Sequence, residues 1–218
     1  MVIVGNDPVA VEADLVAGRL MCPRCLSPLA RWGFARERVL RDGVVLRPRR
    51  AVCSKEGPKV THVLLPEACL VRRAYRADVI GEVLQAVFAG HQFFEDVARR
   101  AGVPPDTVYE WLRRFRRNAV AIARHFGRWL AAFLPGRVLP QRRGSESAYA
   151  LEMIGAAAKA ASLRLGPKPP WSWASALSAG GLLSNTSSPW PLPDSAPPFG
   201  PGHSRTKGGA QWKTEQGL

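Results

Sequence analysis

Three cysteines are the residues of this chain whose type and spacing best suit chemistry. Cys22 and Cys25 are separated by Pro-Arg, which is the spacing of one half of a zinc knuckle. Cys53 begins a similar motif, but Glu56 stands where its second cysteine is expected. Because thiolates are preferred ligands of zinc, the sequence predicts a zinc site formed by Cys22, Cys25, Cys53 and Glu56.

The fourth ligand of this predicted site is left open by the sequence. Glutamate is a poor partner for three thiolates, since structural zinc sites prefer sulfur or imidazole. His62 and Cys69 are therefore alternatives to Glu56, although a histidine in an alternating strand is more typical of a surface or half-buried residue. The remaining alternative is a module that folds by packing alone, without metal.

The net charge of the chain indicates a nucleic-acid partner. The 218 residues carry a formal net charge of +14, and arginine supplies 25 of the 31 basic side chains. Arginine makes bidentate contacts with phosphates and with guanine edges. A GC-rich genome would also enrich arginine, and composition alone does not separate this interpretation from nucleic-acid binding.

The segment Phe93–Arg117 has the spacing of a helix-turn-helix. Ala98 has to be small where the two helices cross, Gly102 ends the first helix in the left-handed region, and Pro105 suits the start of the second. The apolar residues expected between the helices are Val97, Ala101, Val103, Val108 and Trp111. An ordinary helical hairpin without a role in DNA binding is the alternative.

The second helix of this motif is predicted to enter the major groove of double-stranded DNA. Side chains near its N-terminus would face base edges, and these are Pro105, Asp106, Tyr109, Glu110 and Arg113. Further arginines are better placed for phosphates, and these are Arg114, Arg116 and Arg117. Together the eight residues form the predicted DNA-binding site.

A small sheet is expected to hold the cysteines. A short helix is predicted within residues 1–21, with Asp7 as its N-cap. Residues 22–70 are predicted to form a three-stranded zinc-ribbon-like module, in which Asp42-Gly43 turns a hairpin and a third strand follows.

Helices are expected to hold the arginines. Residues 76–134 are predicted to form the helix-turn-helix domain, with one helix before the two of the motif. An apolar pattern at helical spacing continues past Arg117, interrupted by Gly127. Residues 135–166 are predicted to be a linker that can contain one more helix, capped by Ser145.

The composition changes at residue 167. Nine of the nineteen prolines lie in residues 167–218, together with four tryptophans, and this segment is predicted to be a disordered tail. Trp171, Trp173 and Trp190 would form a docking motif for a partner protein such as a transposase, or have no partner. The predicted fold class is thus α+β and mainly α, with a ribbon-like module, a trihelical unit and a disordered C-terminal tail.

The chain resembles a family of bacterial, mostly actinobacterial, proteins that pair a zinc-ribbon-like segment with a resolvase-type or transposase-type helix-turn-helix. The resemblance covers Pro8 to Arg117 and departs from the family pattern at Glu56, where cysteine is usual. It rests on Cys22-Pro-x-Cys25, Trp32-Gly33, the arginine-rich run into Cys53, Thr61–Pro66 and Ala98–Trp111. Related arrangements open many transposases and integrases, which implies binding to the ends of mobile elements.

We therefore expect a DNA-binding protein that acts as a transcriptional regulator or is associated with a mobile element. The alternative is a transposase- or recombinase-derived protein, or an enzyme subunit, without its own catalytic domain. Catalysis by this chain is not expected, because strand transfer needs about three carboxylates around two magnesium ions. After Arg117 the only acidic residues are Glu146, Glu152, Asp194 and Glu215.

The sequence also predicts where the protein works. The first ten residues lack the pattern of a signal peptide, and no apolar run of about 20 residues predicts a membrane span. We expect a cytoplasmic, nucleoid-associated protein with reduced or metal-bound cysteines. An isolated trihelical unit binds DNA weakly, so a homodimer or a second contact through the ribbon is expected.

Overall fold

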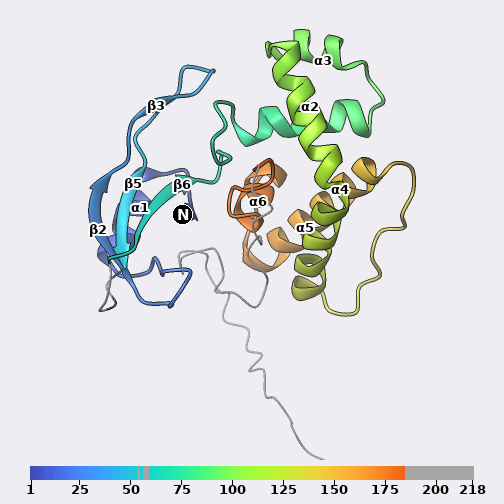
Figure 1. Cartoon of the computed structure of the whole chain (residues 1–218). Helices are drawn as coiled ribbons and strands as arrows, with labels where there is room; N and C mark the ends of the chain where they lie inside the picture. Colours follow the sequence, from blue (N-terminus) through green and yellow to red (C-terminus); the bar gives the residue numbers. More distant parts are fainter. Residues whose placement is uncertain (54, 56–58, 185–218) are drawn as a thin grey trace, which may run out of the picture.

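A computed structural model of the protein describes residues 1–53, 55 and 59–184. Within these residues a small sheet lies on one side of the molecule and most of the helices lie on the other (Figure 1). This mixed architecture of helices and a small sheet confirms the predicted fold class at that coarse level.

Four strands form the main sheet, in the order β1-β6-β5-β2. β1 (Val2–Val4) runs parallel to β6 (Thr61–Pro66). β6 is antiparallel to β5 (Arg49–Cys53), and β5 is antiparallel to β2 (Leu29–Phe34). The sequence predicted three strands here and missed β1, because three apolar residues show no alternation and their pairing with β6 is long-range.

Helix α1 (Pro8–Val16) packs against β2. It begins where the sequence predicted, because the Asp7 carboxylate accepts a hydrogen bond of 2.8 Å from the Val9 backbone nitrogen. The helix and the sheet enclose the first of two cores, which includes Val11, Leu15, Leu29, Ala51 and Leu64.

Beyond β2 and β5, the same two chain segments continue as a two-stranded ribbon. β3 (Arg38–Val39) pairs antiparallel with β4 (Val45–Leu46). The turn between them uses Gly43 at a φ of +84°, a left-handed conformation that glycine adopts without strain. Leu40 is buried in the second core, among the helices. The ribbon therefore connects the sheet to the helical part.

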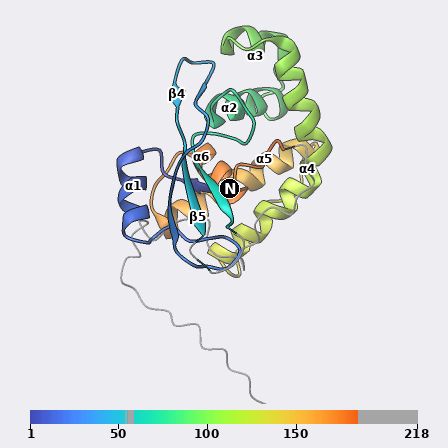
Figure 2. The ribbon, with the colours of Figure 1, turned by 60° about the vertical axis from the view of Figure 1, so that its left-hand side comes forward.

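The helical part contains the other five helices of the described residues. The first three are α2 (Ala77–Phe88), α3 (Phe94–Ala101) and α4 (Pro105–Phe133). They are followed by α5 (Glu146–Leu165) and α6 (Pro170–Leu177). Figure 2 shows that α4 starts beside α3 and runs along the outside of the molecule to reach α5.

The long helix α4 does not end at Gly127. The chain remains helical for 29 residues, and the missing side chain lets α5 approach closely. A Cβ at Gly127 would lie 3.0 Å from the Met153 Cε atom. Helix α5 begins after Ser145, whose hydroxyl accepts a hydrogen bond from the Ala148 nitrogen, as the sequence predicted.

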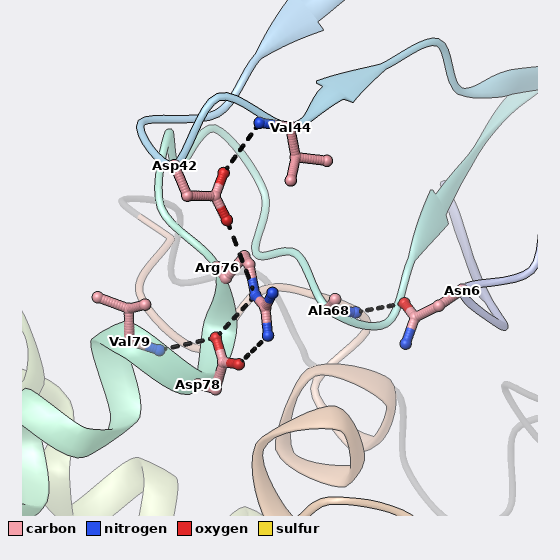
Figure 3. A network of polar contacts seen from close by, with 7 residues as sticks. All are labelled: Asn6, Asp42, Val44, Ala68, Arg76, Asp78 and Val79. Carbon is pink, nitrogen blue, oxygen red and sulfur yellow. Dashed lines mark hydrogen bonds and ion pairs between the residues drawn. The ribbon is translucent and has the colours of Figure 1, made fainter.

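Polar contacts fix the ribbon turn and the sheet to the start of α2 (Figure 3). The Arg76 guanidinium pairs with the Asp78 carboxylate in the first turn of α2, and its Nε atom lies 4.0 Å from an Asp42 carboxylate oxygen. Nearby, the Asn6 side chain accepts a hydrogen bond of 2.9 Å from the Ala68 nitrogen. These contacts set the position of the sheet relative to the helices.

Helix α6 lies between the sheet and the other helices (Figure 1). Trp173 has no exposed surface, and its Nε1 donates a hydrogen bond of 2.8 Å to the Ser162 hydroxyl. Trp171 lies against Gly81, where a Cβ would come within 1.9 Å of the indole. Both tryptophans belong to the second core.

The prediction of a disordered tail over residues 167–218 is therefore wrong for its first part. Residues 170–177 form α6, and Trp171 and Trp173 are buried instead of forming a docking motif. The proline content of this segment indicated disorder, but the apolar residues after Pro170 bury enough surface to order the chain. The remainder of the predicted tail, with Trp190, lies outside the described residues.

We predict that Trp173→Ala destabilises the protein by about 3–5 kcal/mol, because it leaves a large cavity and an unpaired Ser162 hydroxyl. Trp32→Ala is the control, since the Trp32 side chain is 48% exposed, and it should cost less than about 1 kcal/mol. The free energy of unfolding in urea measures both. Equal effects of the two substitutions would contradict the burial of α6.

Candidate metal site and nucleic-acid interface

A tight turn brings two of the predicted metal ligands together. The Cys22 nitrogen donates to the Ser27 carbonyl at 2.8 Å, and the Leu26 nitrogen donates to the Cys22 carbonyl at 2.9 Å. Leu26 adopts a φ of +57° to close this turn. Both cysteines of the Cys22-Pro-Arg-Cys25 motif therefore present their thiols toward the same place.

The sheet brings in the third thiol. Cys53 is the last residue of β5 and pairs with Leu29 at the start of β2, next to the turn. The Sγ atoms of Cys22, Cys25 and Cys53 all lie within 4.8 Å of one another, and those of Cys25 and Cys53 are 3.3 Å apart. Three thiols at such separations could hold a metal ion, and soft or borderline cations such as zinc suit this donor set.

The candidates for a fourth ligand lie in different places. Glu56 is outside the described residues. Cys69 is buried in the second core, away from the three thiols. The His62 Nε2 atom lies 3.4 Å from the Cys22 Sγ atom, although His62 is not part of the group within 4.8 Å. His62 is 4% exposed, so its predicted half-buried position underestimated its burial.

Hydrogen bonds prepare one thiol for metal binding. The side chain and backbone of Ser27, with a further contribution from Cys53, lower the pKa of Cys25 to about 6. Backbone hydrogen bonding at Lys55 lowers the pKa of Cys53, but the contact with Cys25 and partial burial outweigh it and raise that pKa. Cys25 is therefore the thiol of this pair that loses its proton more readily, and the thiolate is the form that binds a metal ion.

The predicted DNA-binding residues follow the turn between α3 and α4. Gly102 ends α3 with φ 64° and ψ 28°, and the Val103 nitrogen donates to the Ala98 carbonyl at 3.0 Å. The side chains that fix the two helices are buried as predicted, namely Val97, Ala98, Val103, Val108 and Trp111. Ala101 is exposed, so its predicted place between the helices is wrong.

All eight residues of the predicted site lie in the first half of α4. Six of them are exposed and two are half-buried. Tyr109 is 54% exposed and the Arg113 side chain 53% exposed. Glu110 and Arg114 are half-buried. The other four residues are also exposed, and these are Pro105, Asp106, Arg116 and Arg117.

A carboxylate lies among these arginines. The Glu110 carboxylate accepts two hydrogen bonds from the Arg113 guanidinium, at 3.1 and 3.0 Å, and lies 3.4 Å from the Arg114 Nε atom. The hydrogen bonds from Arg113 hold the pKa of Glu110 below its usual value. Arg113 and Arg114 are therefore oriented by a local partner, while Arg116 and Arg117 extend the positive surface.

Arginines of β5 and of the segment between β6 and α2 make internal contacts. Arg49 makes a bidentate pair with the Glu12 carboxylate at 2.7 and 2.9 Å, and Arg50 donates to the Thr61 hydroxyl at 2.8 Å. Arg73 donates to the Leu183 carbonyl. Arg49 and Arg50 thus hold α1 and β6 in place. Arg73 fixes the chain after α6 and also lies close enough to Arg114 and Glu110 of α4 to interact with their charges.

Comparison with protein-family models, with curated proteins and with solved structures finds no match to this chain. Among the described helices, none combines the length and apolar character that crossing a membrane requires.

We predict that Ser27→Ala raises the pKa of Cys25 above about 6, so that less thiolate is present at pH 7 and alkylation slows. Iodoacetamide labelling of reduced, chelator-treated protein over a range of pH, followed by peptide mass spectrometry, measures this change. Cys69 is the internal control, because burial raises the pKa of its thiol. An unchanged pH profile for Cys25 would refute the role of Ser27.

Proposed function

We propose that this protein binds double-stranded DNA through the first half of α4, which enters the major groove as the second helix of a helix-turn-helix. The observation that carries the proposal is the surface formed by Tyr109, Arg113, Arg116 and Arg117 on a helix whose opposite side is fixed by Val108 and Trp111. A helix with side chains is about 10–12 Å wide, which matches a major groove of about 12 Å.

The two ends of α4 have different surroundings, which supports this assignment. Its second half packs against α5 at Gly127, whereas its first half contacts α2 and α3 on one side only. The helix is about 43 Å long, from 29 residues at 1.5 Å each. Its N-terminal half can therefore contact a duplex without moving α5.

The pairing of Arg113 with Glu110 is compatible with base recognition. The Arg113 and Glu110 side chains are 53% and 42% exposed, and an ion pair this accessible to water contributes little to stability. A guanine edge offers Arg113 a bidentate contact through its O6 and N7 atoms. Arg116 and Arg117 carry no sequence information in this proposal and serve as phosphate ligands.

The thiol cluster belongs to the same proposal as a structural zinc site. Zinc held by Cys22, Cys25 and Cys53 would cross-link the turn after α1 to the end of β5, and so stabilise a zinc-ribbon-like module. The protein would act as a regulator or as an accessory factor of a mobile element, without catalysis of its own. Its transposase-type family, nucleoid location and homodimeric state stay predictions.

We predict that Arg113→Ala relaxes sequence preference, because the bidentate guanine contact is lost. Affinity for a duplex chosen by in vitro selection should fall about 5- to 150-fold, with little change on a random duplex. Fluorescence anisotropy with both duplexes measures the ratio. If the two affinities fall equally, Arg113 does not read a base.

We predict that Arg117→Ala weakens binding to every duplex alike and reduces the slope of log K against log salt by about 1, because one phosphate contact is lost. Arg164→Ala is the matched control. Arg164 is exposed and donates to the Phe133 carbonyl, at the opposite end of α4. A slope that changes in the control and not in Arg117→Ala would place the DNA elsewhere.

We predict about one zinc per purified chain and its loss in Cys25→Ser, because a thiolate ligand is removed. Elemental mass spectrometry measures the metal, and Cys69→Ala, which alters a thiol in the other core, should retain it. Wild-type protein that contains no metal and keeps its fold would contradict the proposed zinc site.

A further inference from the structure

The pairing of β5 with β6 places a histidine on the same face of the sheet as a thiol. His62 pairs directly with Ala51, and the Cys53 nitrogen donates to the Val60 carbonyl at 2.9 Å, which continues the ladder by two residues. Residues two apart on a strand share a face, and paired residues do so as well. His62 and Cys53 are therefore diagonal neighbours on one face.

The distance from the His62 ring to the Cys22 thiol is close to the separation expected for two ligands of one zinc ion. A tetrahedral zinc ion with sulfur at about 2.3 Å and nitrogen at about 2.0–2.1 Å separates those two ligand atoms by about 3.6 Å. The observed distance between His62 Nε2 and Cys22 Sγ is 3.4 Å. Cys22 and His62 are both buried. The other ring nitrogen, Nδ1, lies 3.4 Å from the N-terminal amine of Met1, which leaves Nε2 as the nitrogen that faces the thiols.

We infer that His62, and not Glu56 or Cys69, is the fourth zinc ligand, so that the main sheet and the turn before it carry a three-cysteine, one-histidine site. The inference rests on the proposed zinc site and deepens it. His62 lies outside the group of thiols within 4.8 Å of one another, so its imidazole would have to move toward Cys25 and Cys53 to share their metal ion.

The net charge of the site favours imidazole over a carboxylate. Zinc with three thiolates has a net charge of −1. A neutral imidazole as the fourth ligand leaves this charge at −1, whereas a glutamate makes it −2. Additional negative charge next to the buried Cys22 is costly.

The surroundings of Cys69 exclude it from this role. It forms an isolated bridge with Arg76, and its side chain belongs to the core around α6. Its carbonyl accepts a hydrogen bond of 2.7 Å from the buried Ser175 hydroxyl, which fixes that segment to α6. Moving this thiol to the cluster would require the junction between the sheet and the helices to open.

Cobalt substitution of the full chain tests the assignment. Reduced protein is stripped of zinc, loaded with one equivalent of Co²⁺, and its absorption is recorded for wild type, His62→Cys, His62→Ala and Glu56→Gln. In His62→Cys we expect the thiolate-to-cobalt charge-transfer band to grow by about one third, from three thiolates to four, and the visible bands to shift to longer wavelength.

The other variants distinguish a metal ligand from a residue that only supports the ligands. His62→Ala should lower Co²⁺ affinity by at least about 100-fold, since loss of a supporting contact alone costs 10- to 100-fold, and Glu56→Gln should leave the spectrum unchanged. Proton NMR of the wild-type cobalt form should show one strongly shifted, exchangeable imidazole N–H resonance. That signal needs no variant and so does not depend on the folding of His62→Ala.

The outcomes distinguish this inference from the proposal beneath it. A wild-type chain that takes up no Co²⁺ overturns the metal site as a whole. A chain that binds Co²⁺ but shows no shifted imidazole proton and the same spectrum in His62→Cys keeps the metal and overturns His62. A spectrum that changes only in Glu56→Gln assigns the fourth position to the glutamate.

Discussion

The structure depends on the continuous burial of one side of α4. Val108, Trp111 and Phe115 pack against α2 and α3, and further along Ile122, Phe126 and Leu130 belong to the core shared with α5. One helix therefore packs against α2 and α3 near its start and against α5 further along. On the outer side of its first half, Arg113, Arg116 and Arg117 remain exposed.

The sheet is tied to this helix through a small number of specific contacts. Leu40 inserts the ribbon into the helical core, and Arg76 lies between Asp42 and Asp78. Helix α6 fills the space between them, and Lys168 next to it pairs with the largely buried Glu67 carboxylate. If the three thiols hold zinc as we propose, its loss would act on the sheet and, through these contacts, on α2 and the surface that we propose for DNA.

Local features of the structure could be predicted from the sequence, and long-range features could not. N-cap side chains predict where α1 and α5 begin, and Gly102 predicts where α3 ends. Helical spacing of apolar residues predicts the buried side chains around Trp111. Each of these signals lies within a few residues of the feature it predicts. The pairing of β1 with β6 and the burial of Trp173 require partners far away in the chain. The approach of His62 to Cys22 is of the same kind, because it depends on the register of β5 and β6.

The most direct test of the account is the affinity of the full chain for duplex DNA as the salt concentration is raised. Binding through Arg114, Arg116 and Arg117 predicts that log K falls linearly with log salt, with a slope of about −3 or steeper, since each phosphate contact contributes about −0.9. No measurable affinity for any duplex, or an affinity that salt does not change, would contradict it.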